Sequence, residues 1–239
     1  MKSNKQEKKD FYSDANTVKQ YEELRFSNIG GKFVHRTEEQ LFNEFLNRCK
    51  LKNSILDIPC GTGRMLPIII SVNADKVYAS DYSEEMLSVC RENYECENIE
   101  FSKQDIYSTH FKDNELSIVL SSRFLFHCDD QKRLFSEFKR IVEPGGCLIM
   151  DSLRWSPRTW TSMFKNELGG EIYTNSSTSI RELARLHGFE VVDSRSILAL
   201  PSFFYNFIPR FLISFLTTLE SIWPDCLKTK QVWMLRKYE

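Results

Sequence analysis

The sequence lacks an excess of charge of either sign. Its 239 residues include 32 Lys and Arg against 33 Asp and Glu, and the formal net charge is −1. Proteins that hold a nucleic-acid backbone usually carry a positive excess, so we expect no nucleic-acid partner. An uninterrupted apolar run of about twenty residues, long enough to cross a bilayer, is also missing.

The seven cysteines lack the spacing of a zinc site or of a disulfide framework. Their number is odd, and no two of them are separated by only two residues. This pattern favours reduced thiols, a cytoplasmic location and no bound metal. The lysine-rich residues 1–10 lack the apolar core of a signal peptide. We therefore expect a soluble protein in which residues 1–34 form a flexible leader and an N-terminal cap.

What is present is an alternation of short apolar runs with amphipathic runs, which predicts an α/β domain with a mainly parallel sheet over residues 35–239. Strands are predicted at residues 54–58, 76–80, 99–103, 115–121, 147–150, 189–196 and 229–235, and helices at 37–49, 64–72, 83–93 and 177–187, with a further helix between residues 130 and 144.

The predicted helix starts rest on capping residues. Thr37-Glu38-Glu39-Gln40 has the form of a capping box, after a break at Asn28-Ile29-Gly30-Gly31. Later helices are expected to begin at Ser83, at Asp129 or Asp130, and at Ser177 or Thr178, because Ser, Thr and Asp side chains accept hydrogen bonds from the first free amides of a helix.

The loop Cys60-Gly61-Thr62-Gly63 lies between a predicted strand and a predicted helix, where open α/β sheets bind nucleotide-like ligands. A dinucleotide fingerprint requires a small residue three positions after Gly63, but Leu66 stands there; a phosphate-binding loop requires a lysine, which this loop lacks. Asp57 would repel a pyrophosphate and attract a ligand carrying an ammonium and a sulfonium. These residues favour a cationic cofactor over a dinucleotide, a phosphate or an ordinary turn.

The segment Ile55–Arg64 resembles motif I of class I methyltransferases, which use S-adenosylmethionine. The likeness extends over residues 35–196 and is greatest to the small-molecule group typified by the ubiquinone and menaquinone methyltransferases. It implies a Rossmann-like, seven-stranded, mostly parallel sheet with helices on both faces. To this the sequence adds an N-terminal helical cap and, before the last strand, an unusual helical insertion at residues 198–226 that is particular to this chain. The resemblance also implies that the cofactor contacts Asp57, Pro59, Cys60, Gly61, Thr62, Gly63 and Arg64.

Acidic residues follow the next two strands. Asp81 lies about twenty residues past the loop, the distance at which an acid accepts both ribose hydroxyls; its alternative role is to cap a helix, although Ser83 already offers a cap. The resemblance implies that Tyr82 and Met86 flank the adenine. It further implies that Asp105 and the amide of Ile106 bind the adenine ring; a solvated loop acid is the alternative for Asp105.

Residues after the fourth strand are candidates for the acceptor side. His127 is the candidate general base, because the unperturbed pKa of histidine lies near neutrality; a loop histidine bonded to backbone is an equal alternative. The resemblance places Ser121 or Ser122 where a backbone carbonyl can meet the cofactor ammonium. Arg123 is expected to bind an anionic acceptor or the cofactor carboxylate, or else to pair with Asp129 or Asp130. Lower-ranked candidates are His35 and Arg36 in the pocket, and Tyr12, Tyr21 and Phe26 in a lid.

The insertion at 198–226 carries apolar residues at roughly fourfold spacing. One interpretation is a lid or interfacial helix that admits a lipid-like acceptor and makes a peripheral membrane contact through residues 203–223. The commoner alternative is a helix packed on the core or in a dimer interface, and both a monomer and a homodimer remain open. Three functions are compared: methyl transfer to a small, hydrophobic or lipid-linked acceptor; a nicotinamide-dependent oxidoreductase; and a non-catalytic relative that binds the cofactor, a protein or a membrane.

Overall fold

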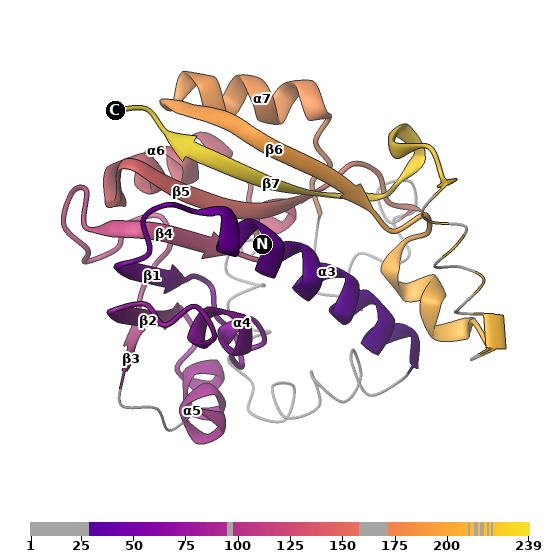
Figure 1. The fold of residues 1–239 in the computed structure, drawn as a ribbon, viewed down its shortest axis with the longest axis horizontal. Coiled ribbons are helices and arrows are strands. Elements are labelled where there is room, and N and C mark those ends of the chain that lie inside the picture. The colour runs from indigo at the N-terminus through magenta and orange to yellow at the C-terminus, as the bar shows by residue number, and fades with distance from the viewer. Residues whose placement is uncertain are drawn as a thin grey trace, which may run out of the picture.

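The computed structural model describes residues 29–94, 98–157, 172–209 and 222–239, together with residues 211, 212, 215, 218 and 220. Within these residues lies a sheet of seven strands in the order β3-β2-β1-β4-β5-β7-β6 (Figure 1). The strands are β1 (Ser54–Asp57), β2 (Lys76–Asp81), β3 (Ile99–Lys103), β4 (Leu116–Ser121), β5 (Val142–Leu153), β6 (Phe189–Ile197) and β7 (Lys230–Lys237). Strands β1 to β5 pair in parallel, whereas β7 runs antiparallel to both β5 and β6.

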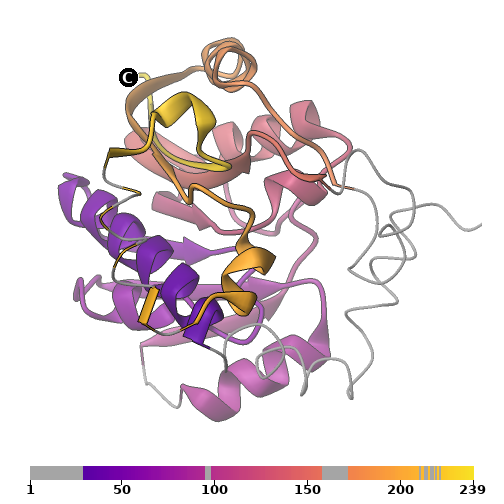
Figure 2. The same cartoon turned by 90° about the vertical axis from the view of Figure 1, so that its right-hand side faces the viewer.

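Helices cover both faces of the sheet. The helices α3 (Ile29–Arg48), α4 (Leu66–Ile70) and α5 (Glu84–Asn93) share one apolar core with one face. The helices α6 (Gln131–Ile141) and α7 (Ser177–Leu186) share a second core with the other face. Figure 2 shows the indigo α3 on one side of the sheet and the pink α6 on the other. The Rossmann-like α/β fold expected from the sequence is therefore confirmed.

Successive strand residues supply the two cores in turn. Ile55 and Ile118 face the first core, and their neighbours Leu56 and Val119 face the second; all four are fully buried. A strand covered on both faces reads as a continuous apolar run, which is why β1 and β4 could be located in the sequence.

Helix capping follows the sequence at two sites and departs from it at a third. The Ser83 hydroxyl accepts a hydrogen bond from the amide of Met86 at the start of α5. The Asp130 carboxylate accepts one from the amide of Arg133 at the start of α6. At α7 the predicted caps Ser177 and Thr178 are wrong, because Ser176 caps this helix and they already belong to it.

The start of α3 is a second correction. The helix begins at Ile29 and runs through Gly30 and Gly31, where a break was predicted. Thr37 is not a cap; its hydroxyl donates to the carbonyl of Phe33 one turn earlier. A glycine costs a helix about 1 kcal/mol relative to alanine, but the first turns are held by packing, since the Phe33 ring stacks on Tyr205 of the insertion with centroids 5.3 Å apart. The helix therefore crosses the expected boundary between residues 34 and 35.

Strand β5 begins at Val142, five residues before the predicted start at residue 147. Val142 pairs with Leu116, and the register shifts before Cys147 pairs with Ile118. Pro144, Gly145 and Gly146 therefore lie within an irregular part of the strand and not in a turn before it.

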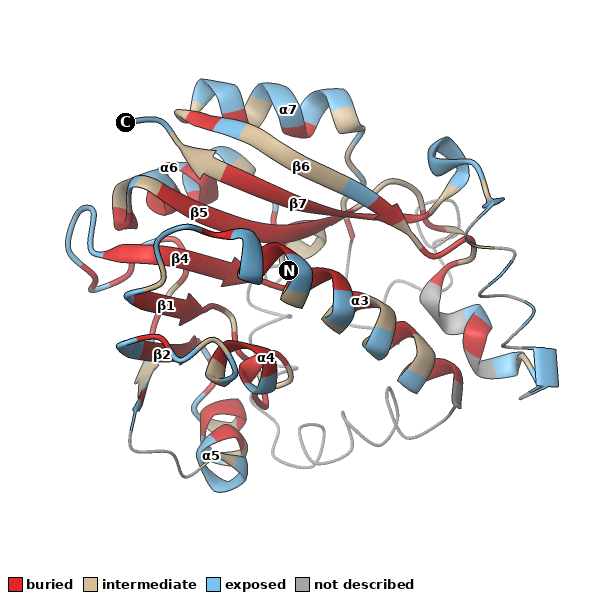
Figure 3. Ribbon diagram, viewed as in Figure 1, coloured by how far each residue is buried: buried red, intermediate tan, exposed pale blue. Residues whose placement is uncertain are grey.

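The insertion joins β6 to β7 and contains two short 3₁₀ helices, η4 (Ser202–Phe207) and η5 (Asp225–Leu227). Tyr205 is fully buried against α3. Other apolar side chains of the insertion lie in solvent: Phe207 is 80% exposed and Phe211 is 78% exposed. Figure 3 shows this contrast between the buried sheet and the pale blue tip of the insertion. Among the described residues, no helix has the length and apolarity needed to span a membrane.

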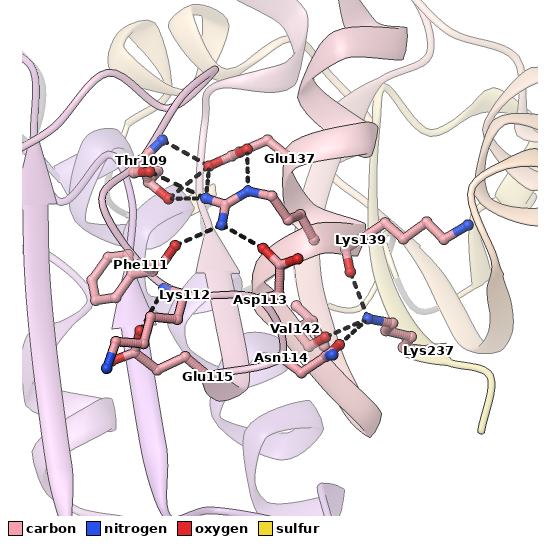
Figure 4. A network of polar contacts seen from close by, with 11 residues as sticks. Thr109, Phe111, Lys112, Asp113, Asn114, Glu115, Glu137, Lys139, Val142 and Lys237 are labelled. Carbon is pink, nitrogen blue, oxygen red and sulfur yellow. Dashed lines mark hydrogen bonds and ion pairs between the residues drawn. The ribbon is translucent and has the colours of Figure 1, made fainter.

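A polar network fixes the loop that leads into β4 (Figure 4). Arg140 of α6 donates to Glu137, to Asp113 and to the carbonyl of Phe111. Glu137 also accepts from both the amide and the hydroxyl of Thr109. This network is structural, because α6 thereby holds the loop against the sheet.

Candidate active site

The candidate site lies at the carboxyl ends of the parallel strands. Asp57 ends β1, Asp81 ends β2 and Ser121 ends β4, and pairing in parallel brings these ends to one edge of the sheet. The strand order reverses between β1 and β4. In open α/β sheets such a reversal opens a crevice that binds ligands.

The glycine loop folds tightly against β2 and α5. Gly61 and Gly63 have φ angles of 56° and 91°, in the left-handed region that favours glycine. The amide of Gly61 donates to the Asp81 carboxylate at 2.9 Å. A Cβ atom on Gly63 would lie 2.5 Å from the ring of Tyr94 and 2.8 Å from the Cys90 sulfur. The loop therefore requires glycine at position 63 both for its backbone angle and for its packing on α5.

Asp81 is organised by backbone amides. Its carboxylate accepts hydrogen bonds from Gly61 and from Ser83, both at 2.9 Å. Burial raises its pKa, and the bonds from these amides oppose that effect. The side-chain cap of α5 comes from Ser83 instead. Each carboxylate oxygen can accept more than one hydrogen bond, so Asp81 has acceptor capacity left for a pair of hydroxyls.

Asp57 is buried, and neither of its carboxylate oxygens has a hydrogen-bond partner among the described residues. Burial raises its pKa to about 8; the charge of Arg64 opposes this increase and that of Asp81 adds to it. An unpartnered carboxyl group inside a protein is costly. A cationic ligand at this point would supply the missing partner.

The residues expected to bind adenine lie at the same edge of the sheet. Tyr82 follows β2 and is 41% exposed, whereas Met86 on α5 is buried. Asp105 follows β3 and accepts a hydrogen bond from the amide of Tyr107 at 3.1 Å. Ile106 is buried beside it. The register pairs Asp81 of β2 with Lys103 of β3, which brings the two loops side by side.

A cluster of charged side chains surrounds Glu38 of α3, which is only 1% exposed. Arg123 donates to it through Nε and Nη2, both at 3.0 Å, Arg64 donates at 2.9 Å, and Lys230 donates at 2.6 Å. Burial alone would raise the pKa of Glu38, but the three positive charges hold it well below its usual range. Glu38 is therefore ionised at neutral pH.

Asp151 of β5 completes this cluster. Its carboxylate forms an ion pair with Lys230 and accepts a hydrogen bond from the backbone amide of Arg123 at 2.7 Å. Arg64 also donates to the Ser122 hydroxyl at 2.5 Å. We call Glu38, Asp151, Arg64, Arg123 and Lys230 the Glu38 cluster.

Arg123 corrects one sequence-based expectation. Its guanidinium pairs with Glu38, not with Asp129 or Asp130. Asp130 caps α6 instead. The pairing was not foreseen because Glu38 and Arg123 lie 85 residues apart in the chain.

Glu38, Asp151 and Lys230 were missed as site residues. Glu38 lies three and four residues before Leu41 and Phe42, so it belongs to the buried face of the helix. A charged residue on a buried face is rarely without a charged partner. The position of Glu38 on the buried face therefore indicates a charged partner, which the capping-box interpretation of Thr37-Glu38-Glu39-Gln40 does not include.

The two candidate histidines have different surroundings. His35 Nδ1 lies 3.2 Å from Arg64 Nη1 and must accept, because a guanidinium only donates. Burial, and next the charge of Arg64, lower the pKa of His35. His127 lies in the 3₁₀ helix η1 (Leu125–His127), with its ring centroid 4.6 Å from that of Phe126. Its role as a base stays a prediction. Arg36 is exposed, and Tyr12, Tyr21 and Phe26 lie outside the described residues.

Comparison with protein families finds a match between residues 56–150 and the family described as methyltransferase domain. Phosphoethanolamine N-methyltransferase 1 of Arabidopsis thaliana is 27% identical over 59% of this chain, but the chain spans only 30% of that protein's length. A ubiquinone/menaquinone biosynthesis C-methyltransferase of Campylobacter jejuni is 24% identical to this chain. The match covers 70% of this chain and 66% of that protein's length. The resemblance to the small-molecule group is thus confirmed.

Solved structures share the fold. Magnesium protoporphyrin IX methyltransferase of Synechocystis superimposes with a TM-score of 0.69 at 14% identity, covering 98% of this chain and 100% of its own. Geranyl diphosphate C-methyltransferase of Streptomyces coelicolor gives a TM-score of 0.64 at 14% identity. The match covers 85% of this chain and 80% of that protein's chain. Both structures hold S-adenosylhomocysteine.

Proposed function

We propose, from the premise that residues 56–150 form a class I methyltransferase domain, that this chain transfers the methyl group of S-adenosylmethionine to a small acceptor molecule. One observation carries the proposal: the buried Asp57 carboxyl group, which has no hydrogen-bond partner among the described residues, lies beside Asp81 at the glycine loop. A cationic adenosine derivative fits both acids, whereas a pyrophosphate would be repelled by them.

The chain's own residues would bind the cofactor in three parts. The Asp57 carboxylate accepts a hydrogen bond from the ammonium group in the amino-acid portion of the cofactor. Asp81, held by the amides of Gly61 and Ser83, accepts from the ribose hydroxyls. Tyr82, Met86, Asp105 and Ile106 surround the adenine.

When bound, the cofactor supplies an activated methyl group on a positively charged sulfur. The protein's contribution is to align the acceptor with that group, since alignment alone removes several kcal/mol from the barrier of a transfer reaction. His127 follows β4 and would accept a proton from an acceptor that must lose one.

The acceptor in this proposal has a substantial apolar part. The insertion exposes the large apolar side chains of Phe204, Phe207, Phe211, Leu212, Phe215, Ile222 and Leu227. The insertion ends where β7 begins, at Lys230, which is a member of the Glu38 cluster. These apolar side chains therefore belong to a segment that is joined to the site edge of the sheet. Among the proteins this chain resembles, one is named for geranyl diphosphate and another for ubiquinone and menaquinone biosynthesis.

Binding of S-adenosylhomocysteine, measured by calorimetry, tests the proposal. We expect micromolar affinity for the wild-type chain and a loss of at least about tenfold in Asp81→Asn, which corresponds to one charge-assisted hydrogen bond or more. Asp75→Asn is the matched control, because Asp75 is an exposed acid that precedes β2 at the opposite edge of the sheet. No binding by the wild-type chain would sink the proposal.

Turnover is tested separately from binding. Transfer of tritiated methyl groups from the cofactor into a cell extract is expected with the wild-type chain and not with Asp81→Asn. Tight binding without any transfer would favour the non-catalytic alternative. Thermal stabilisation by NAD, but not by S-adenosylhomocysteine, would favour the oxidoreductase.

A further inference from the structure

Glu38 and Asp57 are two buried acids of the site in contrasting states. Glu38 is 1% exposed and ionised, because three cationic side chains of the Glu38 cluster surround it. Asp57 is equally buried, yet neither of its carboxyl oxygens has a hydrogen-bond partner among the described residues. Burial raises the pKa of Asp57 to about 8, so the ligand-free group holds its proton at neutral pH. The protein thus satisfies one of these acids and leaves the other for a ligand.

Arg64 is within electrostatic reach of both acids. It follows the glycine loop that begins after Asp57, and its charge acts on the Asp57 carboxyl group. Its guanidinium nevertheless donates to Glu38 at 2.9 Å. It also donates to the Ser122 hydroxyl and lies 3.2 Å from Nδ1 of His35, whose lowered pKa keeps that ring neutral. Glu38 therefore compensates the charge of Arg64 by direct contact, and the Asp57 oxygens accept no hydrogen bond from it.

The ionisation of the two acids explains which of them Arg64 contacts. An arginine side chain has many rotamers and is always charged, so it pairs with a nearby carboxylate that is ionised. Glu38 is ionised because Arg123 and Lys230 also donate to it, at 3.0 and 2.6 Å. Without the Glu38 carboxylate, Arg64 would favour the ionised form of Asp57 and pair with it. An arginine at Asp57 would occupy the oxygens that the cofactor ammonium needs.

We propose that Glu38 is a positioning residue that binds Arg64 and so keeps the Asp57 carboxyl group available for the ammonium of the cofactor. This proposal rests on the proposed function, because it assigns a residue to the ammonium end of that site. Glu38 acts through Arg64 and does not itself touch the cofactor. The helix α3, which carries Glu38 and lies outside the matched residues 56–150, thereby takes part in cofactor binding.

Calorimetric titrations with two ligands test the proposal. S-adenosylhomocysteine carries the ammonium, whereas methylthioadenosine has the same adenosine portion without the amino-acid part. We expect Glu38→Gln to bind S-adenosylhomocysteine at least about tenfold more weakly than the wild-type chain, the equivalent of one charge-assisted hydrogen bond, and to bind methylthioadenosine equally well. Glu44→Gln is the matched control and should change neither affinity, because Glu44 also belongs to α3 but pairs with Arg195 in solvent.

An Arg64→Gln background shows whether Glu38 acts through Arg64. In this background the loss of S-adenosylhomocysteine affinity caused by Glu38→Gln should shrink to less than about threefold, whatever Arg64→Gln costs by itself, because a double-mutant cycle isolates the coupling between the two side chains. A purely structural role for Glu38 instead expects Glu38→Gln to weaken both ligands alike and in both backgrounds.

Asp57→Asn provides a readout that needs no cofactor. In the wild-type chain this substitution should raise the urea midpoint at pH 8, because it removes a buried acid whose raised pKa costs stability at alkaline pH. In Glu38→Gln, Arg64 would already pair with Asp57, so the same substitution should leave the midpoint unchanged or lower it.

The proposal is wrong if Glu38→Gln leaves S-adenosylhomocysteine affinity unchanged, weakens both ligands alike, or acts equally in the two backgrounds at position 64. It is also wrong if Asp57→Asn raises the urea midpoint as much in Glu38→Gln as in the wild-type chain. Should Glu38→Gln not fold, Glu38→Asp takes its place with smaller effects in the same directions, because its shorter side chain reaches Arg64 less closely. Failure of the wild-type chain to bind S-adenosylhomocysteine would contradict the proposed function instead, and the urea measurements would still decide whether Glu38 keeps Arg64 from Asp57.

Discussion

At the scale of single residues, Asp57 shows how a binding site is maintained at a cost to folding. Its carboxyl group is buried without a hydrogen-bond partner among the described residues. Burial therefore raises its pKa from 3.8 to about 8. A pKa change of one corresponds to about 1.4 kcal/mol, so this side chain destabilises the ligand-free fold by several kcal/mol at alkaline pH.

The sign of the resulting pH dependence follows from this raised pKa. Between pH 4 and pH 8 the folded chain keeps the Asp57 proton that the unfolded chain has lost. Its contribution to stability is thus fully present below its ordinary pKa and falls as the pH rises towards about 8. Asparagine cannot ionise, so a chain with asparagine at position 57 does not lose stability in this way as the pH rises.

We therefore predict that Asp57→Asn is more stable than the wild-type chain by at least about 2 kcal/mol at pH 8, with a smaller difference at pH 5. Urea unfolding at both pH values measures it, and S-adenosylhomocysteine binding should be lost in the same variant. Asp75→Asn, an exposed acid, should show neither effect. A stability gain independent of pH would show that Asp57 is already ionised in the fold.

At the scale of secondary-structure elements, the sequence predicted those parts that depend on neighbours along the chain. The strands β1 to β4 were located to within one residue at each end, because apolar runs and flanking acids identify them locally. The start of α3 could not be predicted in this way. It depends on the stacking of Phe33 on Tyr205, a contact between segments separated by most of the chain.

The glycine loop and α5 form one packing unit, which leads to a prediction about Gly63. Gly63→Ala combines a φ of 91° with contacts under 3 Å to Tyr94 and Cys90. Gly61→Ala is the matched control, because its φ of 56° is also left-handed but its Cβ would meet nothing within 4 Å. We expect Gly61→Ala to lose about 1 kcal/mol and Gly63→Ala to lose a further 1–3 kcal/mol or so from overpacking.

Urea unfolding compares the two glycine variants directly. The affinity for S-adenosylhomocysteine should also fall more in Gly63→Ala than in Gly61→Ala. The loop must move away from α5 to make room for the alanine side chain at position 63. Equal losses in both variants would mean that α5 shifts without cost and that the contact with Tyr94 does not constrain the loop.

A further prediction concerns the insertion, for which we expect a peripheral membrane contact through residues 203–223. Phe207 and Phe211 are largely in water, so replacing both with serine should change the stability by less than about 1 kcal/mol. We predict that the double variant floats less with vesicles of phosphatidylcholine and phosphatidylglycerol than the wild-type chain does. Leu186→Ser on α7, also exposed, is the control. Unchanged flotation would contradict the contact.

At the scale of the whole molecule, the Glu38 cluster joins segments that the sequence separates. Glu38 and Lys230 are 192 residues apart, yet their side chains are 2.6 Å apart. The cluster draws on α3, on the loops after β1 and β4, and on β5 and β7. Motif I could be found in the sequence because its residues are consecutive. The cluster could not, because only the folded sheet brings its members together.

The same long-range arrangement predicts how the molecule responds when the centre of the cluster is removed. Glu38→Ala leaves three cations with one carboxylate in a buried site, and breaking a buried ion pair in this way typically costs 3–5 kcal/mol. Glu44→Ala removes another glutamate of α3 that pairs with Arg195 in solvent, where such a pair contributes less than about 1 kcal/mol. Urea unfolding of the two variants should therefore separate them by at least about 2 kcal/mol. Similar losses would mean that water reaches the cluster and screens its charges.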